Sequence, residues 1–141
     1  MLNIVKHIAS VAVLAALPAF AVADEDINLT PALEAAMAWI ALIDAQRYGE
    51  SWDRASTLFQ EATPRVKWEI LAQSVRSPLG MVQGRKMHSA MHSRALPGAP
   101  PGEYVVIRYE THFLNRPFSS ETITPSRDKD GTWKVSGYFI Q

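Results

Sequence analysis

Two kinds of hydrophobic periodicity divide the chain. From residue 30 to about residue 76, apolar side chains recur at the three- and four-residue spacing of an amphipathic helix. From residue 81 onward, apolar and polar positions alternate, as they do along half-buried strands. Helices first and hairpin-connected strands afterwards predict an α+β domain, with N-terminal helices packed on one face of a curved four-stranded antiparallel sheet.

Three helices are expected in the first half. Thr30 and Pro31 predict an N-cap followed by proline at the first helical position. This helix should end near Arg47, Ser51 should cap a short second helix, and Pro64 should open a third. The apolar stripe of the first helix consists of Leu33, Met37, Ile40 and Ile43.

Four strands are expected in the second half, separated by segments rich in Pro, Gly, Asn and Asp. We place them at residues 81–95, 103–114, 118–125 and from residue 133 onward. We expect Met87 and Met91 to face the core together with the apolar positions of the second strand. In that register one polar row would share the opposite face, formed by Lys86, His88, His92, Arg108, Glu110 and His112.

The first 23 residues have the pattern of a secretory signal peptide. A short segment carrying Lys6 precedes an apolar run over residues 8–20, and Ala21-Val22-Ala23 has small residues at both recognition positions. The run would span only about 20 Å as a helix, less than the hydrocarbon core of a bilayer. We therefore expect cleavage after Ala23, a single domain over residues 24–141, and a bacterial periplasmic or secreted location.

Composition removes several function classes. The chain has no cysteine, which excludes disulfides, thiolate metal sites and cysteine nucleophiles. The formal net charge is zero, so there is no electrostatic argument for binding nucleic acid, or a membrane surface after signal cleavage. The sequence contains no nucleophile elbow, phosphate loop or dinucleotide fingerprint, and we expect no cofactor.

The polar row raises two chemical possibilities. Zinc needs about three ligands within roughly 2.1 Å of one point, but His88 and His92 are four residues apart on a strand, hence about 13 Å apart. We therefore expect no metal site. Glu110 and Glu121 flank a turn and might stand opposite each other, which would raise the pKa of one of them and make it a general acid.

Arginine and aromatic residues supply the other candidates. Arg76 and Arg85 present rigid forks that suit carboxylates. They would form either internal salt bridges with Asp44 and Glu121 or an anion-binding point at the mouth of a cavity. Most aromatic residues should lie in the core, but one or two, with Trp39 and Tyr48 as candidates, would line a pocket between helices and sheet.

Several stretches together resemble one bacterial family. They are WIALIDAQRYGESW at 39–52, RSPLG at 76–80, LPGAPPGEYVV at 96–106, ET at 121–122 and GTWKVSGY at 131–138. Their order is similar to that of the exported family called domain of unknown function 4019, over essentially the whole of residues 24–141. The resemblance implies a cystatin-like or NTF2-like fold, with helices packed in the hollow of a bent sheet, and implies no activity.

The resemblance also indicates which individual residues match the typical positions of the family. The positions that match the family are Trp39, Asp44, Tyr48, Trp52, Arg76, Arg85, Tyr104, Glu121, Trp133 and Tyr138. The histidines His88, His92 and His112 are not part of its pattern, which weakens any function that depends on them.

Three functions are compatible with these observations. We expect a non-catalytic module that binds a small molecule or protein in an apolar cavity rimmed by arginine. The first alternative is an enzyme that uses Glu110, Glu121 or His112 as acid or base. The second is a homo-oligomer, such as a homodimer, whose interface would be an apolar patch of Tyr104, Val106 and Ile140. The ligand-binding candidates are Arg76, Arg85, Arg108, Glu110, His112, Glu121, Trp39 and Tyr48.

Overall fold

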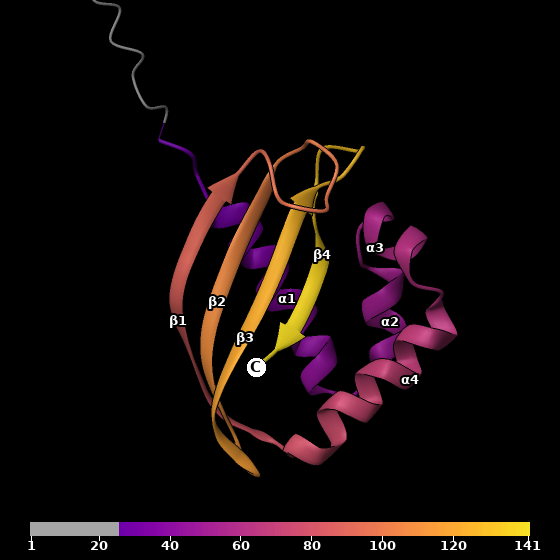
Figure 1. The fold of residues 1–141 in the computed structure, drawn as a ribbon, viewed down its shortest axis with the longest axis vertical. Helices are drawn as coiled ribbons and strands as arrows, with labels where there is room; N and C mark the ends of the chain where they lie inside the picture. The colour runs from indigo at the N-terminus through magenta and orange to yellow at the C-terminus, as the bar shows by residue number, and fades with distance from the viewer. Residues whose placement is uncertain (1–25) are drawn as a thin grey trace, which may run out of the picture.

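Four helices precede a four-stranded antiparallel sheet (Figure 1), which confirms the predicted α+β architecture. The computed structural model describes residues 26–141, so the predicted signal peptide lies outside the described residues. Between residues 26 and 141, none of the helices has the length and apolar character needed to cross a membrane. The helical elements are α1 (Thr30–Asp44), α2 (Tyr48–Asp53), α3 (Thr57–Ala62), α4 (Arg65–Arg76) and the 3₁₀ turn η1 (Ser77–Leu79).

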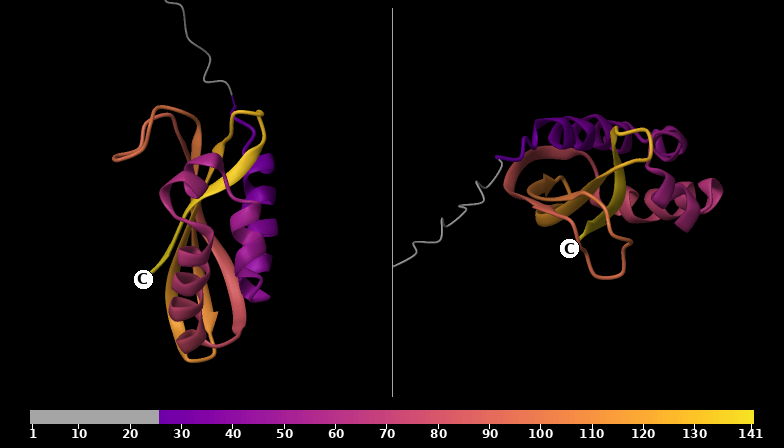
Figure 2. Two further views of the ribbon diagram at one scale, coloured as in Figure 1. Left: turned by 90° about the vertical axis from the view of Figure 1, so that its right-hand side faces the viewer. Right: turned by 90° about the horizontal axis from the view of Figure 1, so that it is seen from above.

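The strands follow one another as a meander in the order β1-β2-β3-β4. Helix α1 lies along one face of this sheet, which we call the inner face, while α2, α3 and α4 lie beyond the β4 edge (Figures 1 and 2). No helix of residues 26–141 covers the opposite face, which we call the outer face. The strands are β1 (Val82–Ser93), β2 (Tyr104–Phe113), β3 (Arg116–Arg127) and β4 (Trp133–Ile140).

The helix ends differ from the predicted caps. Thr30 is the first residue of α1 rather than its cap, and the side chain of Asn28 accepts a hydrogen bond from the Thr30 amide at 3.0 Å. Ser51 lies buried inside α2, because that helix already begins at Tyr48. The serine that does cap a helix is Ser56, whose hydroxyl accepts a hydrogen bond from the amide of Phe59 in the first turn of α3.

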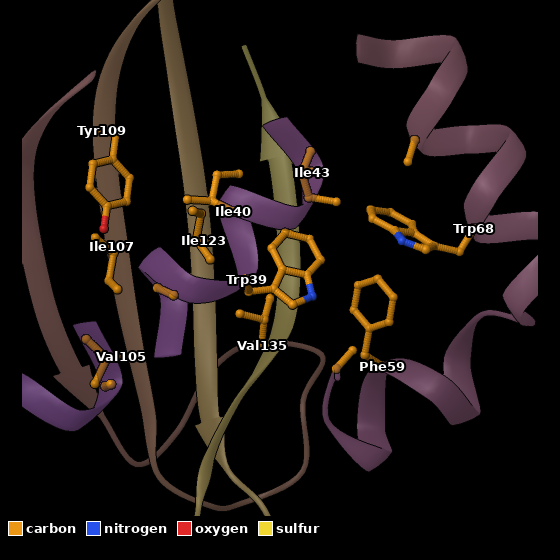
Figure 3. Close-up of a cluster of buried hydrophobic side chains, with 14 residues drawn as sticks. Trp39, Ile40, Ile43, Phe59, Trp68, Val105, Ile107, Tyr109, Ile123 and Val135 are labelled. Atoms are coloured by element: carbon orange, nitrogen blue, oxygen red, sulfur yellow. The ribbon is translucent and has the colours of Figure 1, made fainter. Parts of the chain in front are cut away.

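The core joins α1 to the inner face of the sheet and to the other helices (Figure 3). Trp39 is central to it, with ring centroids 5.9 Å from Trp68, 6.1 Å from Phe59 and 5.4 Å from Tyr138. The indole N–H of Trp39 donates to the backbone oxygen of Ser51 at 2.8 Å. Trp39 is therefore a core residue in contact with three elements, and it also borders a hollow of about 170 Å³ beside Trp133.

The prediction that Met87 and Met91 lie on the same face of the sheet is wrong. A β-bulge between Met87 and Ser89 adds one residue to β1. Met87 pairs with Tyr109 and faces inward as predicted, but after the bulge Met91 pairs with Val106 on the outer face. His92 pairs with Val105 and turns inward, so it leaves the predicted polar row.

The predicted apolar patch for an oligomer interface does not form. Tyr104 is buried, and its hydroxyl donates to the backbone oxygen of Pro100 in the β1–β2 loop. Ile140 pairs with Glu121 and so belongs to the inner side of β4. The loop and the register therefore separate Tyr104 from Ile140. The third strand is also longer than expected, because Arg116 and Pro117 belong to β3 rather than to the preceding turn.

Candidate functional site

The sheet divides the predicted site residues into two groups. Arg85 and Glu121 lie on the inner face with Arg76, and Trp39 and Tyr48 belong to the helices on that side. Arg108, Glu110 and His112 alternate with the buried positions of β2 and therefore lie on the outer face. The candidates thus form two sites rather than one.

The inner group is a network of ion pairs between α1, β1 and β3. Arg85 donates two hydrogen bonds to the carboxylate of Asp44, at 2.8 and 3.0 Å, and one to Glu121 at 2.7 Å. The side chain of Glu121 has no solvent exposure. A single guanidinium therefore bridges two carboxylates and joins α1 to the sheet, which is the internal salt bridge considered among the sequence-based alternatives.

Hydroxyl groups complete the environment of Glu121. Thr111 and Tyr138 each donate a hydrogen bond to this carboxylate at 2.5 Å, one to each oxygen. With Arg85 added, both oxygens of the buried carboxylate are satisfied. Burying a charge is costly unless it is paired and hydrogen-bonded, and Glu121 meets both conditions.

Arg76 brings α4 into the same network. It donates to Asp44 at 2.9 Å and lies 3.4 Å from the hydroxyl of Tyr138, with its guanidinium over the ring of Phe113. Its Nε atom is buried without a hydrogen-bond partner among residues 26–141. A shallow hollow of about 170 Å³ beside it is lined by Asp44, Tyr48 and Arg76 together with residues 80–82.

The pKa shifts follow from this packing. Burial alone would raise the pKa of Asp44, but the hydrogen bonds and charges of Arg85 and Arg76 outweigh it and hold this pKa below its usual value. Burial, together with the charge of Glu121, raises the pKa of Tyr138 far above its usual value, so Tyr138 stays protonated and donates its hydrogen bond. These shifts are those of a structural network that is neutral overall.

The outer group of residues lines a second hollow, which is larger than the one beside Arg76. This outer-face hollow has a volume of about 510 Å³ and opens on the side of the sheet that none of the described helices covers. Arg108 and Glu110 contribute from β2 and His88 from the bulge of β1. The full lining consists of His88, Arg108, Tyr109, Glu110, Phe118, Ser119, Ser120 and Gln141.

Charge and exposure distinguish the outer-face hollow from the inner network. Across the described part of the chain, the side chain of Arg108 takes part in no salt bridge and no hydrogen bond. Phe118 is 77% exposed, although an aromatic ring of this size is normally more buried. His112 lies beside the hollow, 3.4 Å from Glu110 and edge-on to the ring of Phe118.

The predicted acid–base pair does not exist. In the register of β2 and β3, Glu110 pairs with Ser120, whereas Glu121 pairs with Tyr109. The two carboxylates therefore lie on opposite faces of the sheet, because neighbouring register positions alternate between faces. Glu110 is exposed and Glu121 is held by Arg85, so these two residues cannot act on one substrate.

The histidines are separated as well. His88 and His112 are on the outer side of the sheet, and His92 faces inward with its ring nitrogen 3.6 Å from Glu103. Within residues 26–141 no three His, Asp or Glu side chains converge on a point that would hold a metal ion.

Phe118 and Thr111 are among the site residues that sequence reasoning missed, together with Ser119, Ser120 and Gln141 in the lining of the hollow. Phe118 is the one aromatic residue on the outward parity of β3, where it precedes Ser120 and Thr122, and that exception to the alternation was a usable signal. Thr111 gave no signal, because its partner Glu121 is ten residues away on another strand.

Comparison with known proteins places the chain in a family but gives it no activity. A family model described as a protein of unknown function, DUF4019, matches residues 35–138. No curated protein matches the sequence. The matched region includes all of the inner network and most of the outer-face hollow. The chain therefore belongs to the DUF4019 family.

Proposed function

We propose that this protein is an exported, non-catalytic module that binds a small organic anion in the outer-face hollow. The observation that carries the proposal is an arginine, Arg108, that has no partner among residues 26–141 and lies beside an exposed aromatic ring, Phe118, in one hollow. The volume of about 510 Å³ falls within the range of roughly 300–1,000 Å³ that is typical of small-molecule sites.

The chemistry of the lining favours an anion with an apolar part. A guanidinium presents a planar fork of donors that matches a carboxylate. The ring of Phe118 offers a surface on which an aromatic or aliphatic group can pack. Ser120 adds a hydroxyl that can donate or accept. Glu110 would repel a second negative charge, so a monoanion fits the hollow better than a dianion.

The separation of the carboxylates supports a binding role over a catalytic one. Glu121, the most deeply buried acid, is engaged by three donors on the inner face. Glu110 is on the outer face and has His112 as its only ion-pair partner among residues 26–141. A general acid and base acting on one substrate must both reach it, and these two residues do not share a face.

Export is proposed from the sequence alone. The apolar run over residues 8–20 and the small residues before Asp24 are typical of a cleaved signal peptide. The absence of cysteine is compatible with an oxidising compartment, since no thiol needs protection there. We therefore propose a bacterial periplasmic or secreted location for residues 24–141.

A titration with two matched probes tests this function. Phenylacetate has the proposed combination of carboxylate and ring, and benzylamine has the same ring with the opposite charge. In ¹H–¹⁵N spectra of the protein, phenylacetate is expected to shift the amide signals of Arg108, Phe118 and Ser120 with saturation, whereas benzylamine should leave them unchanged. The Arg108→Ser variant is expected to weaken phenylacetate binding by about tenfold or more, as loss of a charge-assisted hydrogen bond would.

Arg94→Ser is the matched control, because Arg94 is an exposed arginine in the β1–β2 loop outside the outer-face hollow. It should bind phenylacetate as the unmodified protein does. Equal shifts with both probes, or equal affinity in Arg108→Ser and Arg94→Ser, would show that this arginine does not select an anion.

A further inference from the structure

Helix α4 carries apolar side chains on both of its sides. Its inward side serves the core, because Trp68, Ala72 and Arg76 are buried there. On its outward side, four large apolar side chains have exposed fractions between 42% and 66%. They are Val66, Ile70, Leu71 and Val75. Adjacent exposed apolar residues that the core does not use are typical of an interaction surface.

No element within residues 26–141 covers this outward side. Helix α4 lies at the margin of the molecule beyond the β4 edge (Figure 1), and the left view of Figure 2 shows it with no other described element in front of it. A broad hollow of about 560 Å³ runs along the helix and is lined by residues 64 to 74 of this side. We use the name α4 face for the surface formed by Val66, Lys67, Ile70, Leu71, Ser74 and Val75.

The order of residue types along the α4 face is the same in both directions. Apolar residues occupy positions 66, 70, 71 and 75 and polar residues positions 67 and 74, so the pattern is symmetric about the midpoint between Ile70 and Leu71. An antiparallel contact with a second copy of the helix would place Val66 against Val75 and Ile70 against Leu71. A contact between identical chains across a two-fold axis requires this self-complementarity, and a contact with a different protein does not.

The charges favour the antiparallel arrangement. Lys67 is the one charged residue of the α4 face, and its neighbours on the helix, Arg65 and Glu69, pair with each other outside this face. In the antiparallel pair, Lys67 lies against Ser74 of the second copy, and the two lysines are about 10 Å apart along the helix axis. A parallel pair would place the two lysines side by side, where like charges repel each other.

We propose that the α4 face binds a second copy of this chain and forms a homodimer in which the two α4 helices are antiparallel. This surface differs from the patch that the sequence predicted for an oligomer and from the outer-face hollow. Helix α4 has 12 residues and is therefore about 18 Å long. An interface of this size is at the small end of specific contacts, which form weak or transient complexes. We therefore expect a Kd of about 10–100 µM.

Sedimentation equilibrium between about 1 µM and about 1 mM protein brackets this Kd. Ile70→Lys places two like charges beside the two-fold axis and is expected to weaken the dimer by about a hundredfold or more. Met91→Lys is the matched control, because Met91 is 68% exposed and Ile70 is 64% exposed, but Met91 lies on the outer face of the sheet. Since both side chains are exposed, neither substitution disturbs the core, and Met91→Lys should dimerise as the unmodified protein does.

Introduced cysteines test the antiparallel arrangement. The chain has no cysteine of its own, so an intermolecular disulfide can form only at the introduced position. In Ile70→Cys the two thiols lie beside the two-fold axis, where the Cα atoms can reach the separation of about 4–7 Å that a disulfide needs. In Ser74→Cys they are about 10 Å apart along the axis. Under mild oxidation at a concentration where the dimer forms, Ile70→Cys is expected to become cross-linked and Ser74→Cys to stay uncross-linked.

Three results would overturn this dimer. They are a protein that stays monomeric over the whole concentration range, equal weakening by Ile70→Lys and Met91→Lys, and equal cross-linking of the two cysteine variants. The outcome is independent of anion binding, because no residue of α4 lines the outer-face hollow. Either proposal can therefore fail while the other holds.

Discussion

Replacing Arg85 with alanine is expected to lower the free energy of unfolding by about 3–5 kcal/mol, because two carboxylates lose their shared partner. Glu121 is wholly buried, and Arg85 supplies the positive charge within 2.7 Å of it. Without Arg85, the fold must either hold this charge uncompensated or protonate it. Asp44 loses two hydrogen bonds at the same time.

Urea unfolding followed by tryptophan fluorescence measures this effect. Arg127→Ala is the control, since Arg127 also pairs with a glutamate, Glu103, at 2.9 Å but on the exposed surface. An exposed pair contributes only about 0–1 kcal/mol, so Arg127→Ala should unfold almost as the unmodified protein does. If Arg85→Ala were as stable as Arg127→Ala, the inner network would not be structural, and a ligand role for Arg85 would regain support.

Replacing Trp39 with alanine is expected to cost a similar amount, about 3–5 kcal/mol, for a different reason. The indole is 3% exposed and its ring contacts Phe59, Trp68 and Tyr138. Alanine would leave a cavity where three elements meet. The surrounding rings come from different helices and from β4, so they cannot all move inward to fill it.

The Trp39→Phe variant separates the contribution of the ring from that of the hydrogen bond. Phenylalanine keeps most of the apolar contact but removes the donor to the backbone oxygen of Ser51. The expected loss is about 1–3 kcal/mol, the cost of leaving a buried acceptor unsatisfied. A loss in Trp39→Phe equal to that in Trp39→Ala would mean that this hydrogen bond, rather than packing, accounts for the contribution of Trp39.

The architecture was predictable because periodicity is a local property. The stripe of Leu33, Ile40 and Ile43 defines α1 without knowledge of its partners, and the alternation around Val105 and Ile107 does the same for β2. The order of helices and strands then limits the packing to a few arrangements. These features account for the agreement between the predicted and observed elements.

Which side chains lie on which face of the sheet was less predictable, because one extra residue in β1 reverses the alternation. The bulge between Met87 and Ser89 reverses the parity of the rest of β1, and nothing in the stretch itself shows where the extra residue lies. Glu121 illustrates a second difficulty. A glutamate on a strand is normally a surface residue, and only partners 17 and 36 positions away, Tyr138 and Arg85, make its burial favourable.

The central claim is that the outer-face hollow retains a small anion through Arg108. The most direct test is native mass spectrometry of the protein and its Arg108→Ser variant, both purified from the compartment to which they are exported. The account predicts that the unmodified chain carries an organic adduct that is lost on denaturation, and that Arg108→Ser is folded but bare. The same adduct on both folded proteins, or no adduct on either, would contradict it.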